Sequence, residues 1–345
     1  MAQATCAACD CSLDANRIKV TIGGKTVEVC CDECAEKLKE AHASATAIKR
    51  KSVAGTNKSL PARQRVQTPS GKIGYAEQGT GPIALFVHGV LLNGHLWRYQ
   101  LANLSDLRRC IAVDLLAHGD TEVSPDQDVS VTSNAQMLKE LLDSLRIEQV
   151  DLVGNDSGGG IAQIFSALYP ERVRSLTLTD CDTHDNWPPE AFKPFLDMAA
   201  GGGLRKTLEA ILADKNIYRS PHALGPAYEH PEHVSDDTIE AYLRPLVRTQ
   251  QRTHDLERFL AAFDNKHTLA VEPQLKTLKA PTLIVWGTDD VYFDVKWSRW
   301  LADNIPGTRR RIEYKGARIF FPEERWAEFN RELREHWVTA EQRRE

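Results

Sequence analysis

Gly154-Asn155-Asp156-Ser157-Gly158 follows directly on Gln149-Val150-Asp151-Leu152-Val153, an apolar-rich segment with the length of a β-strand. A nucleophile elbow, the sharp turn that presents a side chain between a strand and a helix, needs very small residues two positions before and two positions after its centre, because the backbone is crowded there. Both positions are glycine if Asp156 is the centre. Centring the turn on Ser157 would put Asn155 in one of them, where it fits poorly. The stretch therefore predicts a turn that presents the Asp156 carboxylate.

The sequence that follows this stretch supports an elbow. Three glycines come after Ser157, and a helical pattern then runs from Ile161 to Leu168 before Pro170 ends it. A new apolar strand is expected over residues 173–178. Five residues alone would fit an ordinary polar turn equally well. Strand, tight turn, helix and strand in succession form the context that an elbow requires, and this favours the elbow.

The length and composition of the chain are sufficient for one large hydrophobic core. Its 345 residues are 42% hydrophobic and 26% charged, so we expect one large globular domain with an extra small module. No run approaches about 18 consecutive apolar residues and no signal peptide opens the chain, so a soluble cytoplasmic protein is expected. The net charge of −5 does not favour nucleic acid or an anionic membrane as a partner. The expected partner is a small-molecule substrate, and the sequence leaves a monomer and a homo-oligomer both open.

Six of the eight cysteines lie within the first 34 residues and define the small module. They form two groups, Cys6-x2-Cys9-x-Cys11 and Cys30-Cys31-x2-Cys34, on either side of a predicted β-hairpin with a Gly23-Gly24 turn. The hairpin brings both groups to one end, where four thiolates can converge on zinc. Zinc binding would supply the folding energy that so few apolar residues cannot provide. Disulfides are the alternative, which the absence of a secretory signal disfavours.

This module, residues 1–42, also resembles the TRASH/YHS-type treble-clef metal-binding domains. The resemblance rests on Cys6-Ala-Ala-Cys9-Asp10, on Gly24-Lys25-Thr26 and on the segment from Cys30 to Leu38, and it implies Cys6, Cys9, Cys30 and Cys34 as zinc ligands. Cys11 and Cys31 are additional, and Cys31 fits as a ligand beside Cys34 equally well. All six thiols are therefore candidate metal ligands, and the spare pair could serve redox chemistry or a second metal. A linker of small and basic residues is expected over residues 43–62.

The remaining part, residues 63–340, alternates strand and helix signals. Repeated alternation predicts a mostly parallel sheet covered by helices on both faces. From about residue 188 to 268 the pattern is helical without strands, which suits an inserted lid. The expected strands are 72–76, 83–87, 110–115, 175–179, 282–286 and 309–314, and the expected helices include 132–145, 297–304 and 323–337.

Four motifs occur here in the order typical of the α/β-hydrolase superfamily, which the chain resembles over nearly all of residues 64–340. They are Phe86-Val87-His88-Gly89-Val90, Asp114-Leu115-Leu116-Ala117-His118-Gly119, the elbow, and Trp286-Gly287-Thr288-Asp289-Asp290. The resemblance implies an α/β-hydrolase fold, a mostly parallel doubly wound sheet with a helical lid. An Asp at the centre of the elbow is shared with haloalkane dehalogenases and epoxide hydrolases, which implies alkyl-enzyme chemistry.

The resemblance implies a role for each candidate residue. The Asp156 carboxylate would attack a saturated carbon and form an ester that water then cleaves. The main-chain amides of Ser157 and Val90 would form the oxyanion hole. His88 belongs to the same loop motif and is a further candidate there, with a structural role as the alternative. Asp290 stands where the family places the acid that orients a catalytic His.

The catalytic His of the family is missing from the place after the last strand. Arg318 or its neighbour Ile319 stands there, and neither side chain can take a proton from water. Arg318 would instead keep Asp156 ionised or hold an anionic substrate group. Pairing with Glu323 or Glu324 is the alternative for Arg318.

Other side chains are candidates to replace that His. His184 follows the strand after the elbow helix, so it lies at the sheet edge where ligands bind and is the candidate functional imidazole. The predicted lid offers Tyr218, Tyr228 and Tyr242 as phenol donors, although packing is the commoner role of such residues.

These observations support one leading hypothesis and two alternatives. The leading hypothesis is a hydrolase for a small organic molecule with Asp156 as nucleophile and no cofactor beyond zinc in the small module. The first alternative is a lyase or isomerase in which Asp156 only moves protons. The second is a metal-responsive binding protein built on a catalytically disabled hydrolase scaffold.

Overall fold

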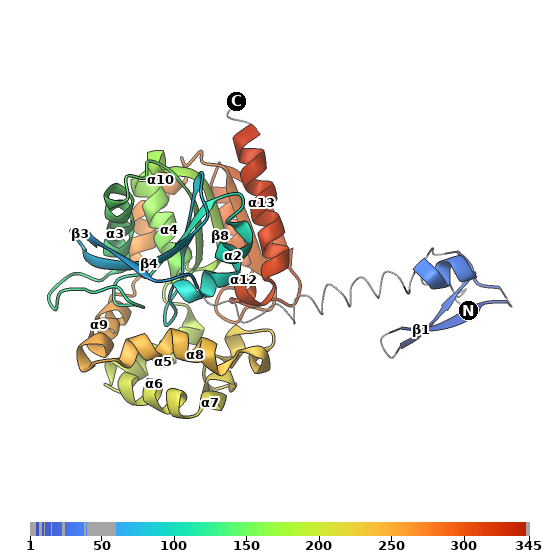
Figure 1. Cartoon of the computed structure of the whole chain (residues 1–345), viewed down its shortest axis with the longest axis horizontal. Helices are drawn as coiled ribbons and strands as arrows, with labels where there is room; N and C mark the ends of the chain where they lie inside the picture. The colour runs from blue at the N-terminus through green and yellow to red at the C-terminus, as the bar shows by residue number, and fades with distance from the viewer. Residues whose placement is uncertain are drawn as a thin grey trace. The chain divides into compact units, whose positions relative to one another are not determined.

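The computed structural model describes residues 5–6, 9, 11–14, 16–22, 25–37, 39 and 60–342. The chain divides into two compact units, residues 1–58 and residues 59–345, each of which is described by itself (Figure 1). Most of the expected linker, residues 43–59, and the expected Gly23-Gly24 turn lie outside the described residues. No helix of the described part is long and apolar enough to cross a membrane.

The small unit is a β-hairpin followed by a short helix. Strands β1 (Ile18–Ile22) and β2 (Lys25–Val29) pair in antiparallel register, with Ile18 opposite Val29. Residues 32–37 are helical. Among the described residues of this unit, the buried hydrophobic cluster consists of Cys6, Val20, Val29, Cys34 and Ala35.

The large unit is built on an eight-stranded sheet with the order β10-β9-β8-β7-β5-β6-β4-β3. The two pairings at the β3 side of the sheet, β3–β4 and β4–β6, are antiparallel, and the other five are parallel. The predicted α/β-hydrolase fold with a mostly parallel sheet is therefore confirmed. The strands are β3 (Gln64–Thr68), β4 (Gly71–Gln78), β5 (Ile83–Val87), β6 (Arg109–Val113), β7 (Val150–Asp156), β8 (Val173–Cys181), β9 (Thr282–Gly287) and β10 (Thr308–Tyr314).

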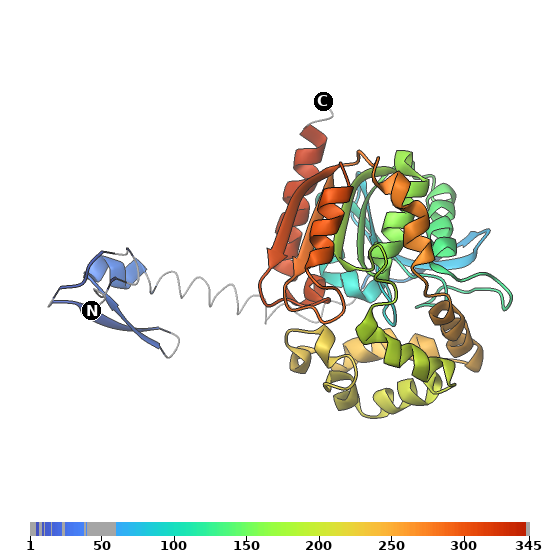
Figure 2. The ribbon, with the colours of Figure 1, turned by 180° about the vertical axis from the view of Figure 1, so that it is seen from behind.

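Helices cover both faces of this sheet. Figure 1 shows α2 and α13 on one face, and Figure 2 shows α4, α10 and α11 on the other. Every residue of β7 is buried, as expected for a central parallel strand that is covered on both sides. The helices are α2 (Arg98–Leu104), α3 (Val131–Ser144), α4 (Ser157–Leu168), α10 (Lys266–Leu275), α11 (Lys296–Asn304), α12 (Phe321–Glu324) and α13 (Trp326–Gln342).

The helix expected over residues 323–337 is divided into α12 and α13. Arg325 leaves helical geometry between them, with φ −109° and ψ 35°. Its guanidinium donates hydrogen bonds of 2.7 and 2.8 Å to Glu229. Local helical periodicity does not reveal this break, because the contact that accompanies it joins residues far apart in the sequence.

The lid is strandless, as the sequence predicted. Its helices lie together beyond one end of the sheet strands (Figure 1). The expected end of the lid at residue 268 falls inside α10, which packs against α4 as part of the layer that covers the sheet. The lid helices are α5 (Lys193–Ala200), α6 (Leu204–Ala213), α7 (Lys215–Arg219), α8 (Asp236–Leu243) and α9 (Gln250–Ala261).

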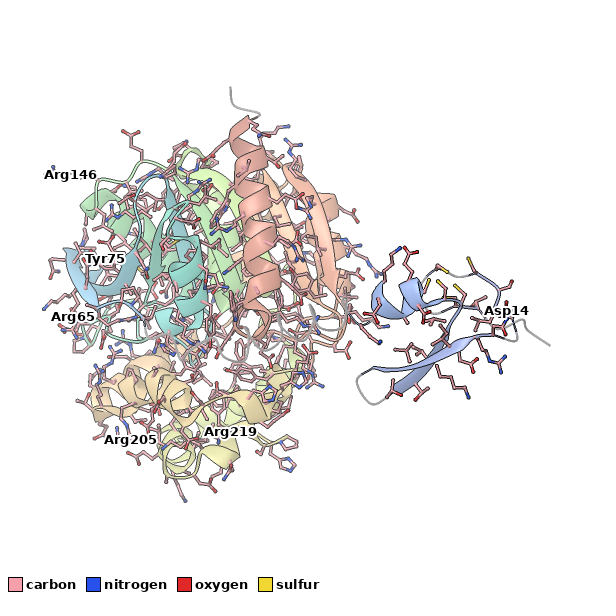
Figure 3. All side chains as sticks on the ribbon, turned by 45° about the vertical axis from the view of Figure 1, so that its right-hand side comes forward. Asp14, Arg65, Tyr75, Arg146, Arg205 and Arg219 are labelled. Atoms are coloured by element: carbon pink, nitrogen blue, oxygen red, sulfur yellow. The ribbon has the colours of Figure 1, made fainter. Side chains whose placement is uncertain are left out.

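Charged side chains are distributed over the outside of the large unit. Arg65 and Arg146 lie on the sheet layer and Arg205 lies on the lid (Figure 3). The apolar side chains of the sheet and of its covering helices form one continuous core that extends into the lid.

Candidate active site

The turn between β7 and α4 is centred on Asp156. This residue has φ 58° and ψ −136°, a left-handed conformation that L residues rarely adopt, and it is only 6% exposed. A Cβ atom at Gly154 would lie 2.6 Å from the carbonyl oxygen of Gly158, and one at Gly158 would lie 2.3 Å from the carbonyl oxygen of His88. Strain of this kind costs on the order of 1–3 kcal/mol, so the surrounding packing must hold the turn in place.

The Asp156 carboxylate is held by two main-chain amides. The amide of Val90 donates a hydrogen bond of 3.1 Å to Oδ2, and the amide of Ser157 also donates to the carboxylate. The loop approaches closely because Gly89 has no side chain; a Cβ there would lie 2.1 Å from Oδ2. Burial raises the pKa of Asp156 to about 7, the nearby Asp290 charge adds to this, and the two amides oppose it.

Asp156 opens into a narrow and mostly apolar cavity of about 20 Å³, which is room for one or two water molecules. Among the described residues that line it, the polar side chains are those of Asp156, Asp182 and Tyr292. No imidazole is among the described side chains that line it. A larger substrate can therefore enter only if the aromatic side chains of the lid move. The other lining residues are Val90, Pro189, Phe192, Leu224, Ala227, Phe263, Phe293, Ile319 and Phe320.

The sequence analysis did not single out Asp182 or Tyr292. Asp182 directly follows β8, is 1% exposed, and has no hydrogen-bond partner for Oδ1 among the described residues. Burial and then the Asp156 charge raise its pKa well above the usual range. Burial also raises the pKa of the Tyr292 phenol to about 12, with further contributions from Asp290 and Asp156. The available signal for Asp182 was its place after the strand next to β7, at the same sheet edge as Asp156.

Asp290 lies in the loop after β9. Its Oδ1 accepts hydrogen bonds from the amides of Tyr292 (2.6 Å) and Phe293 (2.9 Å). Its Oδ2 is enclosed and has no partner within the described part of the chain. Burial raises the pKa of Asp290 to about 7, whereas the two amides and the Arg318 charge oppose the rise.

Asp180 is a third fully buried carboxyl group at this end of the sheet. It accepts hydrogen bonds of 2.9 and 3.1 Å from the amide of Gly287. Burial and then the Asp290 charge raise its pKa well above the usual range. Because like charges disfavour one another, the carboxyl groups gathered here will not all be ionised at neutral pH.

The place of the expected His is occupied by an apolar side chain. Ile319 lines the cavity and is 3% exposed, and its carbonyl oxygen accepts a hydrogen bond of 2.9 Å from Asn155. Arg318 donates a hydrogen bond of 3.0 Å to the carbonyl oxygen of Pro226. Its charge acts on Asp290 rather than directly on Asp156.

The two glutamates considered as partners of Arg318 are engaged elsewhere. Glu323 accepts hydrogen bonds from Arg98 (2.5 Å) and from the Tyr242 hydroxyl (2.6 Å). Glu324 accepts hydrogen bonds of 2.8 Å from the amides of residues 229 and 230. Their contacts join the end of the sheet layer to the lid.

The two candidate imidazoles lie apart from the cavity lining. The Nδ1 atom of His184 is 2.8 Å from Glu272 Oε2, and its ring stacks on Trp300 with centroids 4.7 Å apart. His88 is fully buried; its Nε2 accepts a hydrogen bond of 3.1 Å from the amide of Leu115, and its Nδ1 lies 2.7 Å from the Gly89 carbonyl oxygen. Burial lowers the pKa of His88 well below its usual value, so this ring is neutral and braces the loop that carries Val90.

The phenols expected in the lid also lie outside the cavity lining. The hydroxyl groups of Tyr218 and Tyr228 are 3.0 Å apart, and both residues are fully buried. Tyr242 is likewise buried and donates to Glu323. Tyr292, which comes from the loop after β9, is the phenol at the cavity.

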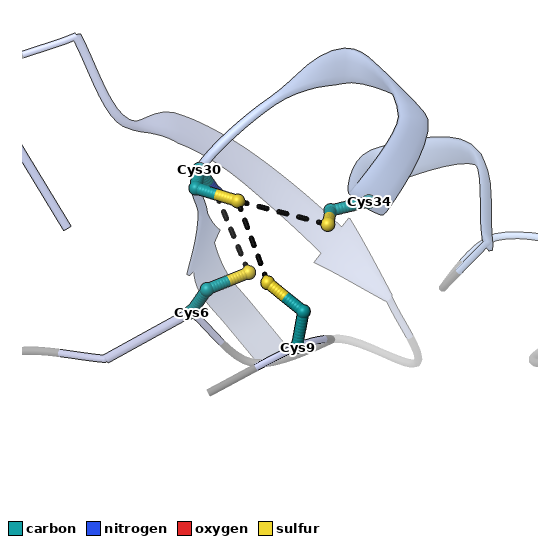
Figure 4. Close-up of side chains that lie close together, drawn as sticks. All are labelled: Cys6, Cys9, Cys30 and Cys34. Carbon is teal, nitrogen blue, oxygen red and sulfur yellow. Dashed lines mark hydrogen bonds between the residues drawn. The ribbon is translucent and has the colours of Figure 1, made fainter. Parts of the chain in front are cut away.

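In the small unit, four of the six clustered cysteines point toward one another. The sulfur atoms of Cys6, Cys9, Cys30 and Cys34 all lie within 4.8 Å of one another (Figure 4). The Cys30 sulfur is 3.5 Å from that of Cys9 and 3.7 Å from that of Cys34. Cys31 is exposed, with its sulfur 3.9 Å from that of Cys30, and Cys11 is exposed as well.

Comparison with known proteins agrees with the fold. The family described as alpha/beta hydrolase fold matches residues 82–324. An uncharacterized protein of Mycobacterium tuberculosis is 39% identical over 264 residues, which cover 70% of this chain and 71% of that protein. A haloalkane dehalogenase of Mesorhizobium japonicum is 28% identical over 199 residues, which cover 56% and 62% of the two chains. The solved structure of the epoxide hydrolase CorEH is similar in fold, with a TM-score of 0.67 at 18% identity over 81% of this chain and 99% of that chain. The chain belongs to the alpha/beta hydrolase fold family.

Proposed function

We propose that the large unit hydrolyses small apolar molecules that carry an electrophilic saturated carbon, and that Asp156 is its nucleophile. The proposal rests mainly on one observation: main-chain amides donate hydrogen bonds to the Asp156 carboxylate, which stands at the centre of a strained turn. A serine-centred elbow would direct a hydroxyl group into the cavity. Here Ser157 is fully buried, and its Oγ has no hydrogen-bond partner among the described residues.

The contacts of Asp156 suit both halves of a reaction that passes through an ester. In the first step Oδ1 attacks the carbon and the leaving group departs, while Oδ2 becomes the carbonyl oxygen of the ester. Water then adds to that carbonyl carbon, and negative charge develops on Oδ2. The amide of Val90 already donates to this oxygen, and the amide of Ser157 donates to the same carboxylate, so both donors are in place for the charge that develops there.

The cavity walls indicate the kind of substrate. Four phenyl rings, those of Phe192, Phe263, Phe293 and Phe320, line the cavity into which the reacting carboxylate opens. Such walls favour small apolar groups over charged ones. The dehalogenase and epoxide hydrolase among the similar proteins act on substrates of this general kind, which supports the same class here.

Substitution of Asp156 tests the proposal. Asp156→Ala should abolish hydrolysis of styrene oxide and of 1-bromobutane, two probes of the class. Ser157→Ala is the matched control, because it removes only a side chain and keeps the amide; it should retain activity within about tenfold. Activity that survives Asp156→Ala and is lost in Ser157→Ala would overturn the assignment.

One observation favours a second candidate, a lyase or isomerase. The cavity lining offers no imidazole, and the pKa of Asp156 lies at about 7, which suits a group that both takes up and releases a proton near neutral pH. In that reaction Asp156 would move a proton without forming an ester. The fate of labelled water oxygen separates the two reactions.

For the small unit we propose a structural zinc ion held by Cys6, Cys9, Cys30 and Cys34. Four thiolates at a Zn–S distance of about 2.3 Å in tetrahedral geometry have their sulfur atoms about 3.8 Å apart. The sulfur separations of 3.5 and 3.7 Å around Cys30 are close to that value. Cys6 and Cys34 are also buried, as ligands of a structural ion usually are.

A further inference from the structure

Asp182 shares the cavity with Asp156, and the sheet register brings the two together. Strands β7 and β8 pair in parallel so that Asp156 lies opposite Cys181, which places Asp182 one residue further along the same edge. The Cβ of Asp182 lies against Gly160 in the first turn of α4. Its carbonyl oxygen accepts a hydrogen bond of 2.7 Å from Gln163, which fixes the loop. Both residues therefore have fixed backbone positions and line the same cavity.

One carboxyl oxygen of Asp182 is buried without a hydrogen bond among the described residues. It is 1% exposed and its Oδ1 has no hydrogen-bond partner among the described residues, although it lines the cavity. An unpaired buried carboxylate is costly, and the group avoids the charge by holding a proton. A neutral carboxylic acid that lines the same cavity as Asp156 can serve as a proton donor there.

The proposed reaction needs a proton carrier, and few groups can fill this role. Arg318 cannot release its proton, and Ile319 has none to give. Asp290 is outside the cavity lining, and one of its oxygens is bound by two amides. Among the described residues of the lining, Asp182 and the Tyr292 phenol remain. Burial raises the pKa of the Tyr292 phenol to about 12, so the phenol keeps its proton at neutral pH and cannot take one from water.

We propose that Asp182 is the proton carrier of this site and that it adapts the enzyme to substrates with an oxygen leaving group, namely epoxides, in preference to alkyl halides. The inference rests on the proposed role of Asp156 as nucleophile. A halide leaves as a stable anion and needs no proton, so a neutral acid in the cavity gives it no help. An epoxide oxygen leaves as an alkoxide and needs one.

The protons and electrons balance over the cycle. Asp156 Oδ1 forms a bond to a ring carbon, the ring C–O bond breaks with its electron pair on oxygen, and the Asp182 proton passes to that oxygen. Asp182 is now a carboxylate, and it takes a proton from the water that adds to the ester carbon. The tetrahedral adduct expels the alkoxide, which regains a proton from Asp182 and leaves as a diol. Asp156 then carries the remaining proton and returns it to Asp182, as a carboxyl pair that shares one proton can do.

The variant Asp182→Asn tests the inference because it keeps the shape of the side chain and removes its transferable proton. With styrene oxide, diol formation should fall by about 10²–10⁴-fold, the usual contribution of general acid and base catalysis. With 1-bromobutane, whose first step needs no acid, this variant should accumulate an enzyme that is heavier by one butyl group on the Asp156 peptide, because water is no longer deprotonated. Asp185→Asn, in the same loop but outside the cavity lining, is the matched control and should behave as wild type.

The outcomes separate the two proposals. Diol formation at the wild-type rate in Asp182→Asn, with Asp156→Ala inactive, would overturn the role of Asp182 and leave the nucleophile intact. If neither wild type nor Asp182→Asn forms a butyl ester or a diol, both proposals fall. Should Asp182→Asn not fold, Asp182→Glu keeps an acid in the cavity. That variant should form the diol at a reduced rate without accumulating ester, and ester accumulation in it would contradict the inference.

Discussion

The main-chain amide of Val90 donates a hydrogen bond of 3.1 Å to Oδ2 of Asp156, so two segments separated by 66 residues meet at the reacting carboxylate. The loop after β5 supplies the donor and the end of β7 supplies the acceptor. This contact holds Oδ2, and the proposed reaction uses Oδ1 for attack on a substrate. The chemistry proposed for the site depends on this division between the two oxygens.

The close approach of that loop requires glycine at position 89. A Cβ there would lie 2.1 Å from Asp156 Oδ2, so Gly89→Ala should displace the carboxylate and break its bond to the Val90 amide. We expect a loss of at least about 10²-fold in kcat for styrene oxide, the usual effect of losing one oxyanion donor. Gly201→Ala is the control, because a Cβ there meets only ordinary contacts at 3.4 Å or more. Equal activity of the two variants would contradict the geometry.

The buried carboxyl group of Asp156 should make stability depend on pH. Its pKa is about 7 in the folded chain, against about 3.9 in an unfolded one, so the folded state binds more protons between these values. The free energy of unfolding should therefore fall as pH rises from about 4 through about 7, by up to a few kcal/mol in total from this group.

Asp156→Asn removes that titration and should be more stable than wild type at pH 8, with the difference shrinking toward pH 4. Urea unfolding across this range measures it. Asp185→Asn, an exposed change, should follow the wild-type curve. If the free energy of unfolding of wild type instead rose relative to that of Asp156→Asn as pH increased, the predicted direction of the pH dependence would be wrong.

Much of the fold was predictable because it depends on local pattern. The strands over residues 83–87 and 282–286 were predicted within one residue of β5 and β9, since buried parallel strands are continuous apolar runs. The elbow was predictable for a similar reason, because its two glycines are imposed by a backbone constraint within five residues. The loop motif containing Val90 stands at a fixed place after a strand.

The rest of the site depends on contacts that local pattern does not encode. Phe192 and Phe263 come from the two ends of the lid and meet over Asp156 only when the lid has folded onto the sheet. His184 was selected for lying at the correct sheet edge, yet its ring turns toward Glu272 and Trp300. Asp182 is two residues away on that same loop and lines the cavity. The sequence pattern predicted where the loop after β8 lies, but tertiary packing determines which of its side chains, Asp182 or His184, faces the cavity.

Restoring an imidazole should change the second step of the reaction. Ile319 lines the cavity, and Asp290 Oδ2 has no partner within the described part of the chain. In Ile319→His, one ring nitrogen could donate a hydrogen bond to Asp290 Oδ2, and the other could take a proton from the water that attacks the ester. Hydrolysis of 1-bromobutane should therefore rise by about 10²-fold. Ile319→Leu is the control for the change of packing and should show no gain. A folded Ile319→His variant with unchanged turnover would mean that the loop does not direct this position toward the ester.

The small unit should bind one zinc ion per chain through four of its six cysteines. Cys6→Ser should lose the ion, because its buried sulfur is one of the four that meet, whereas Cys11→Ser should keep it. Zinc content after gel filtration, measured by atomic absorption, distinguishes them. Zinc that is lost equally from both variants would contradict the ligand set. Removal of the ion by a chelator should make the small unit sensitive to protease, because binding supplies its folding energy.

A single-turnover reaction in water enriched in oxygen-18 tests the role of Asp156 most directly. Enzyme in excess over styrene oxide is quenched after one cycle, and both the diol and the peptide that contains Asp156 are analysed by mass spectrometry. The account predicts one labelled oxygen in the Asp156 carboxyl group and an unlabelled diol, because water attacks the ester carbonyl carbon. Label in the diol together with an unlabelled Asp156 peptide would contradict it.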